Sequence, residues 1–348
     1  MDIEDAIQDE QEELFERLTI FTDKGQEPYR IDKFLMNRIE GATRNKIQQA
    51  IEAGMVLIND KPVKSNYKIR GLDKIVVYQS RIPETTEIIP ENIPINIIYE
   101  DNDLLVINKP SGMVVHPGSG NRNGTLINAV AWHLKLQDPT IDESSLPRFG
   151  LVHRIDKNTT GLLVMAKGQK AMNDLAKQFF DHTVYRRYFA LVWGDFAEEE
   201  GTIHSHVGRH QRFRKLFTTY PEGEHGKDAI THYKVLERFN YVTLLECRLE
   251  TGRTHQIRVH MKYIGHPVAC DELYGNGKPI LLSSFKKKYK LSQHDEVERP
   301  LLGRLALHSS QLKFSLPNEL KFDLEAPLPK DMQAVLMQLR KNRPQQNL

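Results

Sequence analysis

One short polar segment of the chain combines residue types that can catalyse a reaction. His153, Arg154 and Asp156 stand between the apolar pair 151–152 and the apolar run 162–166. We expect a strand on each side, so that the loop between them holds the Asp156 carboxylate on a rigid support. A neighbouring arginine keeps such a carboxylate ionised, and an ionised, partly buried aspartate can act as a nucleophile or as a general base.

Taken alone, this pattern does not establish catalysis, because an Arg-x-Asp sequence is more often a loop salt bridge or a turn cap. Other candidates also have ordinary interpretations. Tyr188 lies in an apolar strand and by itself is a typical core tyrosine. Arg253 and Arg258 lie around an expected strand–helix junction, where arginines also contact phosphates or form surface ion pairs.

Histidines near these segments raise the question of a metal site. His153, His255 and His260 have no acidic residue or cysteine at ligand spacing, and the pattern HExxH is absent from the sequence. The sequence therefore indicates no metal. His204 and His206 alternate along an expected strand, and we interpret them as polar residues of the surface or of a face that contacts a partner.

The charge of the chain is unevenly distributed. The total is +2 over 348 residues, but residues 1–16 hold eight acids and no lysine or arginine. The rest of the chain holds 48 basic and 38 acidic residues, a net charge of +10. A basic body indicates a polyanionic partner, which charge alone leaves open between nucleic acid, acidic lipid and phosphorylated metabolites.

Composition argues against several classes of protein. No apolar run approaches the ~18 residues of a membrane-spanning helix, and the acidic first residues lack the basic region of a secretory signal. Two cysteines, Cys247 and Cys270, cannot form a disulfide framework or, by themselves, a structural zinc site. We therefore expect a cytoplasmic protein that does not bind membranes.

The elements that must position the candidate residues can be placed coarsely. Within residues 28–78, two helical apolar repeats ending at Gly54 precede a hairpin over 56–63 and a strand over 74–78. This small unit holds ten lysines and arginines against five acids. In the longer remainder, short apolar runs bounded by Gly, Pro and Asn dominate, with helices expected near 125–137, 168–182 and 254–264. No regular alternation of strand and helix occurs, so we predict an α+β fold with a mixed or antiparallel sheet.

We therefore divide the chain into five parts. In order they are an acidic tail, the small unit, a proline-containing linker, a large domain and a C-terminal tail, at residues 1–22, 23–82, 83–95, 96–330 and 331–348. Like charge opposes compaction of the acidic tail, which we expect to be disordered or a short helix.

The motifs of the chain resemble two known families. The helix pair followed by GMVLINDKPVKSNYKI (54–69) resembles the S4 RNA-binding fold, which docks a basic face on structured RNA. The segment HRIDKNTTGLLVMAK (153–167) resembles the signature HRLDxxTSGLLL of RluA-type pseudouridine synthases, with Ile155 for leucine and Thr160 for serine. Further segments match that family in order: VINKPSGMVVHPG (106–118), YRRYFALVWG (185–194), GKDAITHYKVLE (226–237) and LETGRTHQIRVHMKYIGHPVACDELYG (249–275). Arg186 stands where lysine is usual, and Cys270 before Asp271 departs from the common pattern.

The resemblance implies a small S4-type module joined to a catalytic domain that isomerises uridine to pseudouridine in RNA, without a cofactor or a metal. By matching positions, Asp156 is the catalytic aspartate, Tyr188 stacks on the target base and can move a proton, and Arg258 pairs with Asp156. Arg154 displaces the target base and takes its place in the RNA. Two roles stay open for Asp156, attack on the sugar C1′ or removal of a sugar proton.

Basic residues indicate where RNA is bound. The segment HVGRHQRFRKLF (206–217) interleaves basic and aromatic side chains, as phosphate neutralisation and base stacking require, although without the family a solvated loop is an equal interpretation. Candidate RNA-binding residues are His153, Arg154, Arg253, Lys33, Arg44, Lys46, Lys61, Arg209 and Arg214.

Three functions remain in competition. Within the resemblance, an S4 unit favours large-subunit ribosomal RNA as substrate, with transfer RNA as the alternative. A second hypothesis is a non-catalytic RNA-binding or ribosome-assembly protein. The presence of Asp156, Tyr188 and Arg258 together argues against it. A glycosidase would need a second positioned carboxylate, which the sequence does not offer at a suitable place. No large apolar stripe is evident, so we expect a monomer.

Overall fold

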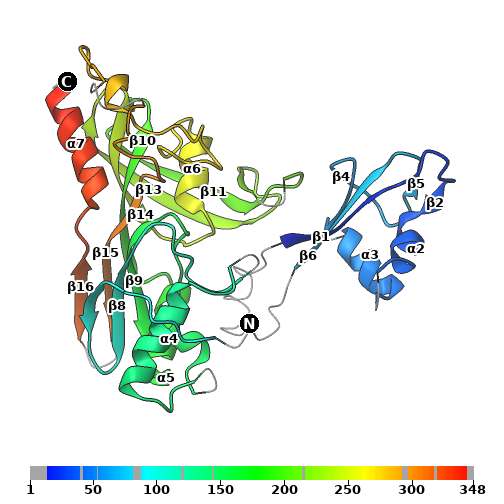
Figure 1. Ribbon diagram of the computed structural model, residues 1–348, viewed down its shortest axis with the longest axis horizontal. Helices are drawn as coiled ribbons and strands as arrows, with labels where there is room; N and C mark the ends of the chain where they lie inside the picture. Colours follow the sequence, from blue (N-terminus) through cyan, green and yellow to red (C-terminus); the bar gives the residue numbers. More distant parts are fainter. Residues whose placement is uncertain are drawn as a thin grey trace. The chain divides into compact units, whose positions relative to one another are not determined.

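The structure is a computed structural model that describes residues 14–39, 42–52, 54–80, 88–118, 121–142, 145–213, 216–291, 297–316 and 320–342 (Figure 1). Of residues 14–17, 46, 79 and 80 it describes the backbone alone. The chain folds into two compact units, and each is described by itself. The smaller contains the described residues of 14–80 and 209–217, and the larger contains those of 88–208 and 218–342.

The smaller unit packs two helices against a four-stranded sheet. The strands lie in the order β1 (Leu14–Phe21), β6 (Lys74–Ser80), β3 (Val56–Ile58) and β4 (Lys61–Pro62). A second pair joins β2 (Tyr29–Arg30) to β5 (Lys68–Ile69), and the helices are α2 (Ile31–Met36) and α3 (Arg44–Glu52). Apolar residues of both helices and of β3 and β6 share one core.

Local sequence explains the hairpin predicted over residues 56–63, which the structure confirms. Strands β3 and β4 pair antiparallel through Leu57↔Pro62 and Ile58↔Lys61. Asn59 and Asp60 between them have φ values of 50° and 62°. Two consecutive left-handed residues make the type I′ turn, whose twist matches that of the flanking strands.

The acidic tail expected over residues 1–22 is shorter than predicted. Residues 14–21 form strand β1, which pairs antiparallel with β6 from Leu14↔Ser80 to Phe21↔Lys74. Leu18 and Ile20 pack against the core of the smaller unit, so the apolar residues of this segment follow the period of a strand. Residues 1–13 lie outside the described residues.

The larger unit is built on a ten-stranded mixed sheet (Figure 1). Nine strands follow the order β12-β11-β13-β14-β10-β15-β9-β8-β7, and β16 pairs with β15. Their bounds are β7 (Ile97–Glu100), β8 (Leu104–Lys109), β9 (Thr160–Ala166), β10 (Tyr185–Trp193), β11 (Glu200–Arg209), β12 (Phe217–Tyr220), β13 (Lys227–Arg238), β14 (Val242–Leu249), β15 (Leu307–Ser315) and β16 (Lys321–Glu325). The helices are α4 (Leu126–Gln137), α5 (Gln169–Phe180), α6 (Gln256–Tyr263) and α7 (Lys330–Asn342). Two short 3₁₀ turns cover Pro147–Gly150 and Leu282–Ser284. Helices α4, α5 and α6 confirm the three helices predicted for this part of the chain.

Alternation along the strands places helices on both faces of the sheet. In β8, Leu105 and Ile107 belong to one core, which also holds buried residues of α4, α6 and α7. Leu104 and Val106 belong to a second core on the other face, where α5 packs. Strand β9 is buried on both faces, which explains the continuous apolar run of residues 162–166.

One glycine permits the parallel contact that joins β9 to β15. The two strands pair only through His308↔Thr160 and Ser309↔Gly161. Gly161 has φ +110°, and a Cβ there would lie 2.1 Å from the Ser309 carbonyl oxygen. A larger residue would therefore push the strands apart just where the polar segment ending at Asn158 meets the sheet.

Two further boundaries differ from expectation. Residues 88–95 were expected in a linker, but Ile88 is buried in the core of the larger unit, and the Asn128 amide donates to the Ile89 carbonyl at 2.8 Å. Residues 331–348 were assigned to a C-terminal tail, with a sequence compatible with a helix up to about Leu339. The described part of this segment forms helix α7, which belongs to the larger unit. Met332 and Leu336, four residues apart on one helical face, are buried in the same core. No helix in the described ranges is both long and apolar enough to span a membrane.

Candidate active site

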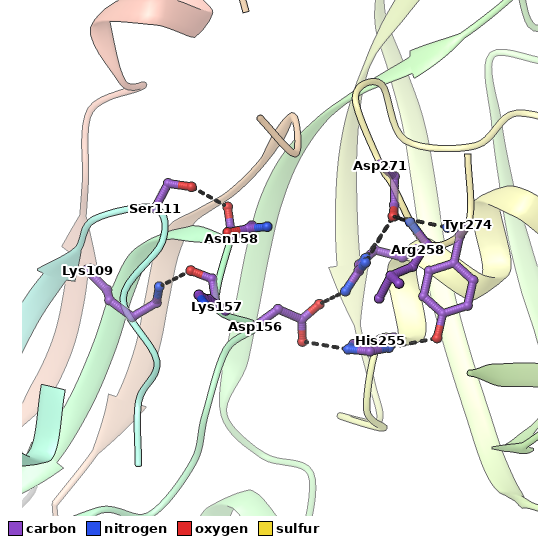
Figure 2. Close-up of polar contacts among 10 residues, drawn as sticks. Lys109, Ser111, Asp156, Lys157, Asn158, His255, Arg258, Asp271 and Tyr274 are labelled. Atoms are coloured by element: carbon purple, nitrogen blue, oxygen red, sulfur yellow. Dashed lines mark hydrogen bonds and ion pairs between the residues drawn. The ribbon is translucent and has the colours of Figure 1, made fainter. Parts of the chain in front are cut away.

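The polar loop that carries Asp156 lies directly before β9. The Asp156 side chain is 21% exposed. The turn after β8 supports the chain just beyond it: the Gly112 N–H donates to the Lys157 carbonyl at 2.9 Å, and the Ser111 hydroxyl donates to the Asn158 carbonyl at 3.1 Å (Figure 2). The backbone around Asp156 is therefore anchored to a buried strand.

Lys109, the last residue of β8, is fully buried and anchors the same loop. Its ammonium donates to the carbonyl oxygens of Pro110, Met113 and Lys157 at 2.8, 2.9 and 3.0 Å. Three acceptors satisfy the three N–H groups of an ammonium. Burial lowers the pKa of Lys109 to about 7, while the negative charge of Asp156 acts in the opposite direction.

Arg258 of α6 approaches Asp156 from the other side of the site. Its Nη1 donates to Asp156 Oδ2 at 2.8 Å (Figure 2). Its Nε and Nη2 donate to the two oxygens of Asp271 at 2.8 and 2.9 Å, a bidentate pair. The Arg258 side chain is 8% exposed and that of Asp271 is completely buried. Bidentate geometry fixes the guanidinium plane, so Asp271 holds Arg258 in the direction of Asp156.

The charges around Asp156 keep its carboxylate ionised. Burial raises the pKa of Asp156, but the positive charges of His255, which is protonated in acid, and of Arg258 and Arg154 outweigh burial, and the pKa lies below its ordinary value. Burial acts on Arg258 in the opposite direction and lowers its pKa. The two carboxylates outweigh burial, with the larger contribution from Asp271, and raise the pKa of Arg258 well above its usual range. Asp156 is thus an anion at neutral pH, as a nucleophile or a base must be.

Sheet register brings Tyr188 into the same site. Tyr188 of β10 pairs with Ser309 of β15, which in turn pairs with Gly161 of β9. Tyr188 is only 6% exposed. Burial raises the pKa of its hydroxyl, and the charge of Asp156 adds to this increase although Arg186 opposes it. The phenol therefore stays protonated at neutral pH, close enough to Asp156 to respond to its charge.

The other residues predicted in the catalytic loop divide into two kinds. Arg154 is half-buried, and it makes no hydrogen bond or ion pair with another described residue. His153 instead accepts a hydrogen bond from the Val164 N–H at 3.0 Å, and its ring stacks on Phe179 at 4.3 Å. Burial lowers the pKa of His153 to about 3, so it is a neutral structural side chain, which does not suit it to phosphate binding.

Arg253, predicted to bind RNA, lies at the approach to α6. Its Nε donates to the Asp228 carbonyl at 2.9 Å, and its backbone N–H donates to Gln256 at 2.9 Å. The side chain is half-buried. The bond from Nε to the Asp228 carbonyl fixes the orientation of the guanidinium.

The predicted RNA-binding residues of the smaller unit differ in how they are held. Lys33 and Lys61 are exposed. Arg44 donates from Nε to Asp32 at 3.1 Å, while 47% of its side chain remains exposed. The side chain of Lys46 lies outside the described residues.

The loop between β11 and β12 shows the interleaving of cations and rings noted in the sequence. The Arg212 guanidinium lies 5.2 Å from the Phe213 ring, and that of Arg209 lies 5.1 Å from Phe217. Phe213 is 53% exposed, and His210 Nδ1 accepts from its backbone N–H at 3.1 Å. Such a ring can stack on a base. Arg214 lies outside the described residues.

Sequence reasoning did not find every residue of the site. The motifs contain Lys109, Asp271 and Tyr274 but indicate no role for them, and the sequence suggests for His255 only a metal ligand, which it does not support. Lys109 offered one signal, a lysine at the end of a strand that begins with four apolar residues. Asp271 is the second carboxylate that a glycosidase would need, but both its oxygens are bound to Arg258, so it is not poised as an acid or a base. Across the described ranges, no group of three or more His, Cys, Asp or Glu side chains is arranged to hold a metal ion.

Comparisons with known protein families match both units. The family described as RNA pseudouridylate synthase matches residues 103–263, and the S4 domain matches residues 30–76. An uncharacterised RNA pseudouridine synthase of Chlorobaculum parvum is 45% identical over 93% of this chain and 98% of its own length. The ribosomal large subunit pseudouridine synthase D of Nitrosomonas europaea is 42% identical over 89% of this chain and 84% of its own length.

A solved structure has a similar fold. Human RNA pseudouridylate synthase domain containing 4 is 24% identical and covers 70% of this chain and 93% of its own length, with a TM-score of 0.54. The predicted α+β fold with an N-terminal S4 unit is confirmed.

Proposed function

The chain belongs to the RNA pseudouridylate synthase family, and we propose that it isomerises specific uridines of large-subunit ribosomal RNA with Asp156 as the catalytic group and without a cofactor. In this reaction the N1–C1′ bond breaks, the uracil rotates and a C5–C1′ bond forms. C5 then loses its proton while N1 gains one, so the product is an isomer of the substrate. No electron donor or transferred group is required.

The observation that carries the proposal is the pairing of an ionised Asp156 with Arg258. The carboxylate is 21% exposed, which leaves it accessible to a substrate, and the arginine contacts only one of its oxygens at 2.8 Å. Asp271 accepts hydrogen bonds from Nε and Nη2 of the arginine and so fixes its orientation. A preorganised pair of this kind costs no reorganisation when charge develops at the sugar.

Two further side chains are assigned roles around the flipped base. The target uridine must leave its stack to reach Asp156, and an aromatic side chain can hold it there. Tyr188 supplies the ring and a protonated hydroxyl beside Asp156. Arg154 makes no hydrogen bond or ion pair with another described residue, so its guanidinium can fill the space left in the RNA.

Release of the C5 proton tests the enzymatic part of the proposal. RNA labelled with tritium at uridine C5 should release tritium to water when incubated with the protein. Asp156→Asn should abolish release while RNA binding persists. Binding without release from any ribosomal or transfer RNA would favour a non-catalytic RNA-binding protein.

The substrate is tested in cells. Pseudouridine mapped with and without the gene should differ in large-subunit ribosomal RNA, which the name of the Nitrosomonas relative supports. A change confined to transfer RNA would select the alternative substrate.

The S4 unit is tested by removing charge from its surface. The variant Lys33→Gln/Lys61→Gln changes two exposed lysines and no buried contact. If both contact phosphates, RNA affinity should fall and the slope of log affinity against log salt should decrease by about 2. An unchanged slope would place the RNA contacts elsewhere.

A further inference from the structure

Five residues form a closed ring of contacts that includes the catalytic carboxylate (Figure 2). On one side, Arg258 joins Asp156 Oδ2 to Asp271. On the other side, His255 Nε2 lies 3.8 Å from Asp156 Oδ1, and His255 Nδ1 lies 2.7 Å from the Tyr274 hydroxyl. The Tyr274 backbone N–H closes the ring by donating to Asp271 Oδ1 at 3.1 Å. Each member is therefore positioned by two others.

The two oxygens of Asp156 have different surroundings. Oδ2 accepts a charge-assisted hydrogen bond from Arg258 at 2.8 Å. Oδ1 accepts no hydrogen bond from any described residue, because the His255 contact at 3.8 Å is longer than a hydrogen bond. The lone pairs of Oδ1 are thus the ones left for a reacting atom.

The His255 ring is held in place from several directions. The residue stands directly before α6 with φ 58° and ψ 17°, a left-handed conformation. That conformation is unfavourable for a residue with a Cβ, and it persists where the surroundings enforce it, often at functional sites. Tyr274 holds Nδ1 and packs edge-to-face against the ring at 5.4 Å, while 19% of the His255 side chain is exposed.

We propose that Oδ1 of Asp156 is the reacting oxygen and that His255, held by Tyr274, is the positioning residue that aims it. A carboxylate fixed at one oxygen still rotates about the Cβ–Cγ bond, whose torsion is broad and roughly two-fold. An imidazole against the second oxygen limits this rotation without covering the oxygen. The inference rests on the proposed function, since it assigns a reacting atom to the same site.

The charge state of His255 fits this role. Burial lowers its pKa below the usual value, although the charge of Asp156 opposes this, so the ring is neutral at neutral pH and leaves Oδ1 free of a strong ion pair. In acid the ring gains a proton and adds a positive charge beside Asp156, which keeps the pKa of Asp156 low. The groups facing His255 are Asp156, Arg154, Arg258, Asp271 and Tyr274.

Three variants separate aiming from folding. Asparagine accepts the left-handed backbone and keeps a polar group near the position of Nδ1, so His255→Asn removes chiefly the group that faces Asp156. His255→Gln places an amide near the position of Nε2. Tyr274→Phe removes one hydroxyl and keeps the ring that lies 4.9 Å from the Arg258 guanidinium. His133→Asn is the matched control, because His133 pairs with Glu100 outside the ring.

The expected result is a fall in kcat of roughly tenfold to a hundredfold for His255→Asn, with KM for RNA within about twofold. The acid limb, the fall of kcat on the acid side of its pH profile, should move to higher pH. The reason is that protonated His255, which lowers the pKa of Asp156 in acid, is lost. His255→Gln should recover part of kcat but not the position of the acid limb, and Tyr274→Phe should give a smaller loss. His133→Asn should change neither.

Other outcomes overturn the inference. An unchanged kcat and acid limb in a folded His255→Asn protein would show that His255 does not position the carboxylate. A fall in kcat without a shift of the acid limb would indicate a structural role, and a rise in KM alone would indicate RNA binding. Absence of tritium release from the wild-type protein would instead count against the proposed function, so the two failures are distinguishable.

Discussion

Asp32 in the smaller unit and Asp156 in the larger are both aspartates paired with arginine, yet their surroundings differ. Asp32 is completely buried and accepts five hydrogen bonds at 2.9 to 3.1 Å, from Arg30 (two), Arg44, Gln48 and the Lys33 N–H. Asp156 is 21% exposed and accepts one such bond from another side chain. Arginine therefore keeps both carboxylates ionised, but only Asp156 retains an uncovered oxygen for chemistry.

The difference shows how the same pair of residue types serves two purposes. When every lone pair of a buried carboxylate is satisfied, the group fixes its neighbours, here two arginines on the basic surface of the S4 unit. When donors cover one oxygen only, the other oxygen of the partly buried carboxylate lacks hydrogen-bond donors and is available to a substrate. We expect substitutions at the two positions to affect different properties.

The largest expected effect is on turnover at Asp156. Asp156→Asn should lower kcat by at least about 10⁴-fold, because the neutral amide can neither attack nor accept a proton. Asp32→Asn should leave kcat at saturating RNA nearly unchanged. Measured side by side by tritium release, equal losses in the two variants would remove the distinction between the two carboxylates.

The next effect is on stability at Asp32. Asp32→Ala leaves Arg30 and Arg44 without their shared partner and should destabilise the smaller unit by roughly 3 kcal/mol. Hydrogen exchange on the full chain, read at the amides of α2 and α3, measures this loss. Unaltered protection of these amides would mean that the saturated carboxylate contributes little to the fold.

A smaller effect is expected at Asp271, which holds Arg258 as Asp32 holds its arginines. Asp271→Asn retains the shape but weakens the bidentate pair, so Arg258 can turn away from Asp156. The kcat should fall by roughly 10²-fold with little change in KM. If KM rises instead, Asp271 acts in RNA binding.

The smallest effect is on pH dependence. The hydrogen bond from Arg30, with others that outweigh burial, holds the pKa of Asp32 far below its ordinary value. A carboxyl with a depressed pKa stabilises the folded state above its unfolded pKa of about 3.9, and this contribution is lost as the pH falls towards the folded pKa. Exchange protection of α2 and α3 should therefore weaken below pH ~4 in the wild-type protein, and the Asp32→Asn variant should lack this component. An identical acid profile in both proteins would contradict the assignment.

Prediction from the sequence succeeded where the information was local. Helical spacing, the turn residues Asn59 and Asp60 and the apolar run of β9 each specify an element within a few residues of chain. It was wrong for residues 14–21, which form a strand, and for the assignment of residues 331–342 to a tail, although the sequence there is compatible with a helix to about Leu339. Whether a short apolar segment joins a sheet or a core depends on a distant surface to pack on. The pairing of β1 with β6 is such a case.

By itself, the sequence determined the type of chemistry: an acidic side chain beside arginines, in motifs that resemble one enzyme family. Only the tertiary structure decided how those residues are arranged. Asp156 and Arg258 are 102 positions apart, and Lys109 and Lys157 are 48 apart, so no local pattern predicts their contacts. The difference between Oδ1 and Oδ2 of Asp156 arises from this packing, because the start of α6 brings His255 and Arg258 to opposite oxygens of a carboxylate that lies on a distant loop.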